Sequence, residues 1–248
     1  MSGSSGTATV VSIVIPAYNE EQTIDAIIRK VEAVTLEGLR KEIVVIDDCS
    51  TDRTRERLEA FGSRIRLIRH ARNQGKGAAV RSGFAAATGD ILLIQDADLE
   101  YNPGDYPRLI APILEGRADA VLGSRFLLER PRFFTRQGQP FFSHYLGNVI
   151  IIWLTNLLYG WRATDYEGCY KAFTRAVIRA TPLESTGFEL DNELVCKLLR
   201  RRRRIVEVPI HYDPRVYGEG KKIRWQHGIR MVWAVLKWRV MPFKSHDD

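Results

Sequence analysis

Short strand-like runs, alternating with segments of helical period, constrain the fold of this 248-residue chain more than any other feature. Six such runs are present, at residues 12–16, 42–47, 65–69, 90–95, 120–123 and 205–209. Between the first four lie segments whose apolar residues recur every three or four positions, as Ile24, Ile27 and Val31 do. This order predicts an α/β protein built on a doubly wound, mostly parallel sheet.

Acidic side chains follow two of these runs at the point where each strand is expected to end. The second run reads EIVVIDD and closes on Asp48, and the fourth reads DILLIQDAD, in which Ala97 separates Asp96 from Asp98. Residues two apart in an extended segment point to the same side, so these two carboxylates are expected to be neighbours. A divalent cation is the usual partner of such a pair. Asp-x-Asp is also common in ordinary turns, so the motif by itself leaves both readings open.

Composition bounds the class of protein. The hydrophobic content is 45%, as in soluble globular proteins, and residues 1–9 predict a disordered tail without a secretory signal. The longest apolar stretches, 148–159 and 229–241, are interrupted by polar residues and too short to span a bilayer. Three widely spaced cysteines indicate a reducing compartment and no disulfide framework. We therefore expect a cytoplasmic protein with one domain at 10–223 and an amphipathic helix and tail at 224–248.

The net charge of +7 favours an anionic partner or none. The five arginines at 200–204 suit either the solvated end of a helix or contact with anionic lipid. The basic residues are not interleaved with aromatic stacking platforms, so nucleic-acid binding is not expected.

The last helical segment also has two readings. Apolar residues such as Trp225 and Trp233 recur at helical spacing, and Arg230 and Lys237 lie between them. Such a helix either packs on the core or lies in a membrane interface.

The strand ends carry neither of two common nucleotide motifs. The first strand is not followed by G-x-G-x-x-G, and the glycines at 75 and 77 do not form a P-loop. A different ordered set is present: IVIPAYNEE, VVIDDCSTDRT, NQGKGAAVRSGF, DILLIQDADLEYNP, GSRF, SHYLGN, TDYEGCYKAF, GFELDNELVCKL and EVPIHYDPRVYGEGKKI.

This set resembles the family-2 glycosyltransferases of the GT-A fold, and in particular the polyprenyl-phosphate hexosyltransferases of the dolichol-phosphate mannose synthase type. The resemblance covers roughly residues 10–240. It implies the GT-A nucleotide-diphospho-sugar transferase fold as a single domain with a C-terminal amphipathic helix. It also implies a metal-dependent, inverting enzyme that moves mannose or glucose from a GDP- or UDP-sugar to a polyprenyl phosphate. The enzyme would be peripheral at the cytoplasmic face of a membrane, and a saccharide or other hydroxyl acceptor is the alternative.

The resemblance also assigns a donor site. It implies nucleotide-sugar contacts from Pro16, Ala17, Tyr18, Glu20, Asp48, Lys76, Gln95, Asp96, Ala97, Asp98, Arg215 and Lys221. Asp96 and Asp98 would hold Mg²⁺ or Mn²⁺ against the donor diphosphate, while Asp48 would accept hydrogen bonds from the base. The simpler alternatives are a helix cap for Asp48, a glycine turn around Lys76, and an exposed basic loop for the segment with Arg215, Lys221 and Lys222.

Acceptor residues follow from the same comparison. Arg125 matches the family's acceptor-phosphate arginine, and Ser143 matches a serine beside it. The dolichol-mannose pattern has a further arginine where this chain has Gln139, so Arg136 or His144 would have to substitute. The expected catalytic residues are therefore Asp98 and Arg125.

A hydroxyl acceptor would need a general base, for which Asp191 and Glu193 are the candidates. Their alternatives are helix-start acids, and for Glu193 an ion pair with Lys197 four residues on.

Overall fold

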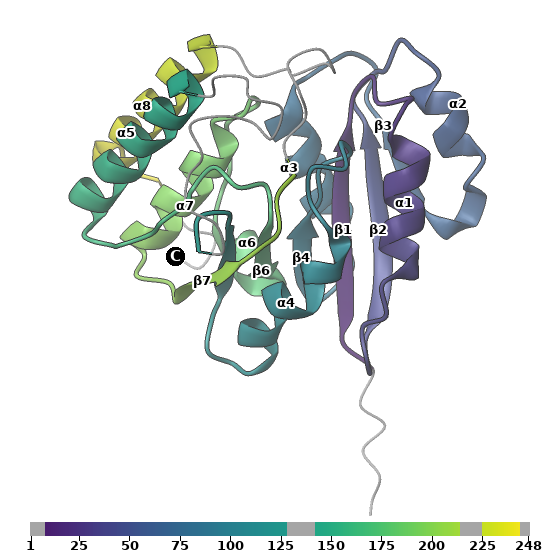
Figure 1. Cartoon of the computed structure of the whole chain (residues 1–248), viewed down its shortest axis with the longest axis horizontal. Helices are drawn as coiled ribbons and strands as arrows, with labels where there is room; N and C mark the ends of the chain where they lie inside the picture. The colour runs from purple at the N-terminus through teal and green to yellow at the C-terminus, as the bar shows by residue number, and fades with distance from the viewer. Residues whose placement is uncertain (1–7, 128–141, 214–224, 244–248) are drawn as a thin grey trace, which may run out of the picture.

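The computed structural model describes residues 8–127, 142–213 and 225–243 (Figure 1). A seven-stranded sheet lies at its centre, in the order β3-β2-β1-β4-β6-β5-β7. The strands are β1 Val10–Ala17, β2 Arg40–Asp47, β3 Arg66–Arg69, β4 Ile91–Ile94, β5 Ala120–Ser124, β6 Lys171–Thr174 and β7 Ile205–Pro209. Neighbours pair in parallel except at β6, which is antiparallel to both β4 and β5. The predicted mostly parallel α/β sheet is confirmed.

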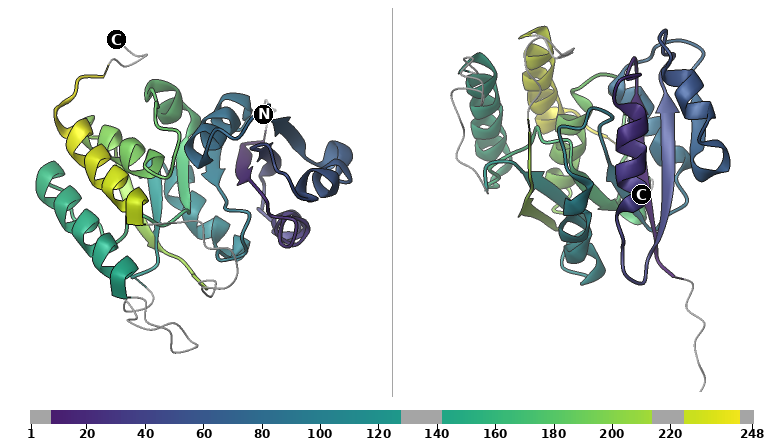
Figure 2. Two further views of the ribbon diagram at one scale, coloured as in Figure 1. Left: turned by 90° about the horizontal axis from the view of Figure 1, so that it is seen from above. Right: turned by 45° about the vertical axis from the view of Figure 1, so that its right-hand side comes forward.

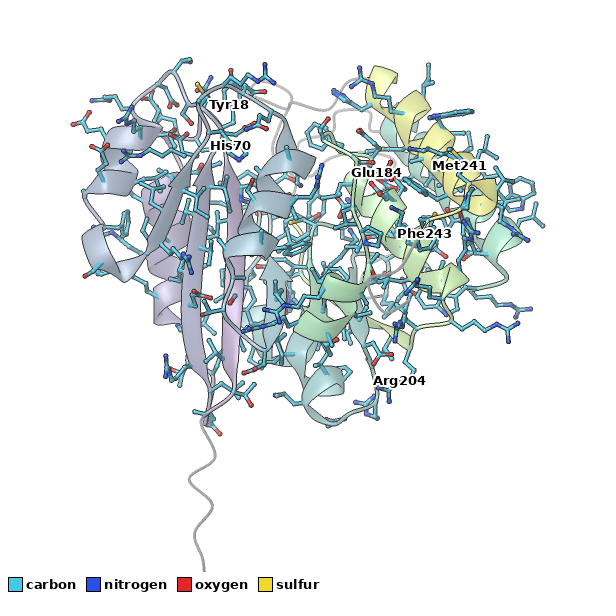
Figure 3. All side chains as sticks on the ribbon, turned by 180° about the vertical axis from the view of Figure 1, so that it is seen from behind. Tyr18, His70, Glu184, Arg204, Met241 and Phe243 are labelled. Carbon is cyan, nitrogen blue, oxygen red and sulfur yellow. The ribbon has the colours of Figure 1, made fainter. Side chains whose placement is uncertain are left out.

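Helices cover both faces of this sheet (Figures 1 and 3). They are α1 Ile24–Ala33, α2 Thr54–Glu59, α3 Lys76–Ala86, α4 Tyr106–Leu114, α5 Phe142–Tyr159, α6 Arg175–Ala180, α7 Leu190–Arg200 and α8 Trp225–Val240, with 3₁₀ turns at Gly62–Arg64 and Pro103–Asp105. Helix α3 packs on β1 and β2, and α4 packs on β5 and β6. Because helices lie on both faces of the sheet, the apolar residues of β1, β2 and β4 are almost all buried.

The apolar runs do not predict β6. This strand is four residues long and begins with Lys171, whose side chain is almost fully buried. A lysine rarely lies in a core unless it is paired, and here Asp191 of α7 supplies the partner. Since that partner is distant in the sequence, the local pattern around Lys171 does not indicate a buried strand.

The parallel pairing brings three strand ends to one edge of the sheet. Ala17 at the end of β1 lies opposite Asp47 at the end of β2, and Val14 lies opposite Ile94 at the end of β4. Tyr18 and His70 mark this end of the sheet in Figure 3. Ligands of open α/β sheets bind outside the carboxyl ends of the strands. The fold therefore gathers the motifs that follow β1, β2 and β4 at the place where such a ligand would bind.

Helices α5, α7 and α8 form a separate layer on the flank of the molecule beyond β5 and β7 (Figures 1 and 2). Their shared cluster includes Ile151 of α5, Cys196 of α7, and Val235 and Trp238 of α8. Tyr159 of α5 also donates a hydrogen bond to the Val235 carbonyl at 2.8 Å. One side of α8 is thus packed against the protein, which confirms the first reading of this helix for that side.

The arginine run at 200–204 has partners within the chain. The Arg200 guanidinium donates to the carbonyls of Trp238 and Met241 at the end of α8, at 2.8 and 2.6 Å. Arg204 pairs with Asp119 at 2.7 Å. These contacts favour a structural role for the two ends of the run. Among the described residues, no helix combines the length and the apolar character needed to cross a membrane.

Candidate active site

The carboxylate pair after β4 meets a lysine from α3. The Lys76 ammonium lies 2.6 Å from an Asp96 oxygen, and the two side chains remain 21% and 19% exposed. Burial by itself would lower the pKa of Lys76, but the negative charge of Asp96, with a smaller contribution from Asp191, raises it above the ordinary value. The end of β4 is therefore a negative site that already holds one cation at an accessible position.

The four residues that follow β4 alternate between buried and partly exposed side chains. Asp96 and Asp98 are partly exposed, whereas Gln95 and Ala97 between them are buried. The Gln95 side-chain oxygen Oε1 accepts hydrogen bonds from the hydroxyls of Tyr106 and Tyr170, at 2.6 and 2.7 Å. The expectation that Gln95 and Ala97 lie against the nucleotide is thus wrong for their side chains, which face the core.

The donor set suits a hard divalent cation that is shared with a ligand. No cluster of three or more metal-ligating side chains occurs in the part of the chain that the structure describes. Two carboxylates are nevertheless what a protein usually offers Mg²⁺, with phosphate oxygens and water completing the shell. Asp98 lies in a tight turn, in which its Oδ1 accepts the Glu100 amide at 3.2 Å and Leu99 has a φ of 63°. Asp96 and Asp98 therefore fit a metal that binds together with a diphosphate.

Glycines hold Lys76 in this position. Gly75 has a φ of 95°, and a Cβ there would come 2.5 Å from the Thr186 carbonyl oxygen. At Gly77 a Cβ would come 2.6 Å from the Gly187 carbonyl oxygen. The Ala78 amide donates to Thr186 at 3.1 Å across the same contact. The glycine turn and the functional lysine are thus compatible, because the turn is what lets α3 begin at Lys76 beside Asp96.

Asp48 has hydrogen-bond partners within the chain. Its carboxylate is buried and accepts the amides of Gln74 and Gly75, at 2.9 and 2.8 Å, and lies 2.6 Å from His70 Nδ1. These partners link both oxygens to the segment that leads to Lys76. The alternative of a helix cap is wrong, since α2 has no side-chain cap. Asp48 instead positions the segment at residues 70–75.

The loops after β1 and β2 are joined by an asparagine that the sequence did not single out. Asn19 has a φ of 52°. Its backbone amide donates to Ser50 Oγ at 3.1 Å, and its side-chain oxygen Oδ1 accepts the Thr51 backbone amide at 2.8 Å. The Glu20 carboxylate accepts the Thr23 hydroxyl at 2.9 Å. Pro16, Tyr18 and Glu20 are partly exposed at this edge, whereas Ala17 is buried. The β1 motif therefore lies at the expected edge, and its asparagine ties the two loops together.

Arg125, after β5, is held by a buried carboxylate. Its Nε and Nη2 donate to the two oxygens of Asp165 at 2.7 and 2.9 Å, and its guanidinium lies 5.1 Å from the centre of the Tyr212 ring. Burial opposes the charge on both groups, but their attraction raises the pKa of Arg125 and lowers that of Asp165. The guanidinium is thus permanently charged and fixed in orientation, with two of its nitrogens donating to Asp165.

Several other acceptor and donor predictions lie outside the described part of the molecule. These are Arg136, Gln139, Arg215, Lys221, Lys222 and the side chains of Ser143 and His144. The backbone of residues 143 and 144 belongs to the first turn of α5.

The two acids at the start of α7 have different environments. Asp191 is partly exposed and pairs with Lys171 at 2.8 Å. Glu193 is fully buried, accepts the amides of Glu184 and Ser185, and pairs with Lys197, itself fully buried 3.6 Å from the centre of the Trp238 ring. Glu193 cannot contact a substrate from there, so the prediction that it acts as a base is wrong and the ion-pair alternative is confirmed.

Glu167 is a titratable group that sequence reasoning missed. Burial raises its pKa to about 7, while a hydrogen bond from the Asn192 amide group at 2.7 Å and the charge of Lys171 oppose the shift. The only signal in the sequence was its place inside the TDYEGCYKAF motif, where it follows Asp165 by two residues. It is close enough to Asp191 for their charges to interact.

Comparisons with known proteins agree with this geometry. Residues 12–186 match the family described as glycosyl transferase family 2. A dolichol-phosphate mannosyltransferase of Pyrococcus furiosus is 30% identical over 92% of this chain and 64% of its own length. The low-salt glycan biosynthesis hexosyltransferase Agl6 of Haloferax volcanii is 29% identical over 95% of this chain and 55% of its own. This chain thus spans less than two thirds of either relative.

The fold has solved counterparts. A glucosyl-3-phosphoglycerate synthase from Mycobacterium tuberculosis, crystallised with Mn²⁺, UDP and phosphoglyceric acid, superposes with a TM-score of 0.70 at 23% identity. The match covers 95% of this chain and 80% of that one. The GT-A fold implied by the motifs is thereby confirmed.

Proposed function

Since the chain belongs to glycosyl transferase family 2, we propose that it transfers a hexose, mannose or glucose, from a GDP- or UDP-sugar to a polyprenyl phosphate. The observation that carries this proposal is the pairing of two sites at one edge of the sheet. Asp96 and Asp98 form an accessible anionic site with Lys76, and Arg125 offers a fixed guanidinium. The first suits a metal-bound diphosphate and the second suits a phosphate acceptor. The curated relative from Pyrococcus furiosus supports the choice of acceptor by its name.

We assign the donor to the carboxyl ends of β1, β2 and β4. Asp96 and Asp98 would hold Mg²⁺ or Mn²⁺, which supplies Lewis-acid chemistry toward the departing diphosphate. Lys76 lies on Asp96 and would move to a diphosphate oxygen as the donor binds. Asp48 and the glycines on either side of Lys76 keep its backbone in place. Arg215 and Lys221 remain proposals for closing over the donor.

The reaction is a direct displacement at the anomeric carbon. A phosphate oxygen of the acceptor forms the new bond to that carbon, while the bond to the nucleoside diphosphate breaks and its electron pair leaves with the diphosphate. A phosphate monoester is largely dianionic at neutral pH, so no base is needed to remove a proton. Arg125 would orient the acceptor phosphate and screen its charge. We place Ser143 and Arg136 beside it. Because the acceptor oxygen attacks the anomeric carbon from the face opposite the departing diphosphate, the reaction inverts the configuration at that carbon.

A hydroxyl acceptor is the second candidate, because titratable acids stand close to the donor site. Asp191 is partly exposed and interacts with Lys76, and Glu167 beside it has a pKa of about 7. Either could take the proton that a sugar hydroxyl must lose. Under this alternative, Asp191→Asn abolishes transfer and Arg125→Lys has little effect.

We further propose that the enzyme works at the cytoplasmic face of a membrane and is peripheral to it. Its three free cysteines suit a reducing compartment.

A radiolabelled transfer assay tests the proposal. The full chain is incubated with Mn²⁺, polyprenyl phosphate and each of GDP-mannose, GDP-glucose and UDP-glucose. With wild type, we expect label from one of the three donors to appear in the organic phase. With the Asp98→Asn variant, we expect no label there. Absence of lipid-extractable label with every common nucleotide hexose would refute the polyprenyl phosphate acceptor.

A further inference from the structure

Tyr212 lies between the residues proposed for the donor and the arginine proposed for the acceptor. It follows the end of β7, which pairs in parallel with β5, and Arg125 follows the end of β5. The guanidinium carbon of Arg125 lies 5.1 Å from the centre of the Tyr212 ring. At the far end of the same side chain, the Tyr212 hydroxyl donates to Glu100 Oε2 at 2.9 Å. One side chain therefore contacts both the arginine after β5 and the turn after β4.

The turn that Tyr212 contacts is the one that carries Asp98. The Glu100 amide donates to Asp98 Oδ1 at 3.2 Å, and the Glu100 carbonyl accepts the Asp213 amide at 2.9 Å. Beside this bond, Tyr101 and Tyr212 form an antiparallel bridge, and their ring centres are 5.2 Å apart. Backbone pairing and a side-chain hydrogen bond thus join the segment after β7 to the turn after β4.

Charged groups on both sides of Tyr212 act on its hydroxyl. Burial raises the pKa of Tyr212 above the ordinary value, the negative charges of Glu100 and Asp98 raise it further, and the positive charge of Arg125 opposes the shift. The hydroxyl is therefore protonated throughout the neutral range and remains the donor in its bond to Glu100.

The separation of Asp98 and Arg125 matters for the proposed reaction. Asp98 would hold the metal-bound diphosphate, and Arg125 would hold the acceptor phosphate that attacks the sugar. Reacting atoms must approach to about 3–3.5 Å, and a misplacement of about 1 Å can lower the rate by about 10²-fold. A rigid link between the two residues would keep the acceptor oxygen within reach of the anomeric carbon.

We propose that Tyr212 is a positioning residue for the transfer reaction, with its ring fixing Arg125 and its hydroxyl fixing the turn that carries Asp98. This role rests on the proposed function, which supplies the two reacting groups whose separation Tyr212 sets. Tyr212 acts through its two neighbours and does not itself need to touch either substrate.

Tyr212→Phe removes the hydroxyl and keeps the ring. At saturating Mn²⁺ and donor, we expect kcat for transfer to polyprenyl phosphate to fall by about 10-fold, because the turn with Asp98 is no longer tied to Arg125. The KM for the acceptor should change by less than about 2-fold, since the ring still lies against Arg125. Tyr159→Phe is the matched control. It removes a tyrosine hydroxyl that donates to the Val235 carbonyl at 2.8 Å, between α5 and α8, and should leave transfer at the wild-type rate.

Tyr212→Leu removes the ring as well as the hydroxyl. We expect kcat to fall at least as far as in Tyr212→Phe, and the KM for the acceptor to rise by about 10-fold because Arg125 loses its cation–π contact. Urea unfolding establishes that each variant is folded under the assay conditions. The proposal is overturned if Tyr212→Phe transfers as fast as wild type, or if Tyr159→Phe slows transfer equally.

A nuclear magnetic resonance measurement tests the ring without any transfer. The Nε–H resonance of Arg125 in the isotope-labelled full chain is assigned by its disappearance in Arg125→Lys. An aromatic ring displaces the resonances of nuclei that lie over its face, so this signal should be displaced in wild type and in Tyr212→Phe. In Tyr212→Leu the displacement should be reduced, and an unchanged signal there would overturn the proposal.

The two measurements distinguish failure of this role from failure of the proposed function. If wild type transfers no hexose to polyprenyl phosphate while the Arg125 signal depends on the Tyr212 ring, the acceptor is refuted and Tyr212 still positions Arg125. If wild type transfers the hexose and Tyr212→Phe matches it, the proposed function stands and the positioning role is refuted.

Discussion

The end of β4 and the start of α7 both pair a carboxylate with a lysine, but in opposite environments. At β4, Asp96 and Lys76 are each about one-fifth exposed, so an incoming ligand can separate them. At α7, Glu193 and Lys197 are fully buried beneath Trp238, and the Glu193 oxygens also accept two backbone amides. The same pair of residue types thus forms an accessible ion pair that a ligand can separate in one place, and a buried structural ion pair in the other. Access to solvent, rather than charge or spacing, separates the two roles.

The largest expected effect is at the accessible pair. Asp96→Asn and Asp98→Asn should each lower the transfer rate by on the order of 10³-fold, because each removes a carboxylate that would hold the divalent cation, and that cation would balance the diphosphate charge in the transition state. Thermal-shift titration with Mn²⁺ and nucleotide should lose its stabilisation in parallel. Asp25→Asn, which alters an exposed carboxylate paired with Arg57, is the control and should behave as wild type. Retention of more than about a tenth of the rate by either variant would contradict the assignment.

Glu193→Gln should instead cost stability, by about 3–5 kcal/mol, since it leaves Lys197 charged and unpaired in the core. Burial would raise the pKa of Glu193, but hydrogen bonds from Lys197 and the Ser185 amide hold it below the usual value. A depressed carboxyl pKa contributes stability at neutral pH that is lost as the pH falls below about 4. Urea unfolding of wild type and variant should therefore converge in acid.

A second variant controls for this result. Replacing both members, Glu193→Gln with Lys197→Met, should recover part of the stability, because an apolar side chain can replace a buried charge. Nucleotide affinity of the folded single variant should be unchanged. A stable Glu193→Gln protein without activity would show that Glu193 takes part in the chemistry after all.

Arg125→Lys should reduce transfer to polyprenyl phosphate by about 10²-fold while leaving donor affinity unchanged. Lysine keeps the charge opposite Asp165 but loses the two parallel hydrogen bonds and the planar fork. Steady-state rates at varied acceptor concentration measure the effect, with Arg117→Lys as an exposed control. If Asp191→Asn has the larger effect, the hydroxyl acceptor is correct.

The smallest effect concerns Glu167 and has the opposite pH dependence to Glu193. Its pKa is raised to about 7, so the stability it contributes is complete in acid and lost as the pH rises through neutrality. Glu167→Gln removes this loss and should be more stable than wild type at pH 8, by up to about 2 kcal/mol relative to the difference at pH 5. Urea unfolding at both pH values measures it. If the difference in unfolding free energy between wild type and Glu167→Gln is the same at both pH values, the pKa of Glu167 is not raised and its carboxyl contacts solvent.

The residues proposed for the donor lie largely where the sequence predicted, at the carboxyl ends of β1, β2 and β4. Alternation after β4 correctly separated Asp96 and Asp98 from the chain's buried side, and the motif set correctly identified the family. The errors have one physical origin. Gln95 and Glu193 lie in motifs, but amides and hydroxyls from other segments satisfy their polar atoms in the interior.

The acceptor half was less predictable. Arg125 was expected, but Asp165, which fixes it, is 40 residues away and meets it only because β5 and the segment before β6 are neighbours. Glu167 was missed because a raised pKa depends on surroundings that no spacing reveals. The helical periodicity of α8 was visible, but only the structure shows that one side of this helix packs against α5 and α7 while the other side is exposed.

By itself, the sequence determined the mostly parallel α/β sheet, the family, and the acids and glycines at the strand ends, because periodicity and local turn chemistry depend on neighbouring residues. Only the tertiary structure decided which of those acids is open to a ligand, which is sealed under a tryptophan, and which apolar side of α5 and α8 faces solvent. Burial depends on segments that are distant in the sequence and meet only in the fold. It sets both the accessibility of a charged side chain and the free-energy cost of removing that charge from water.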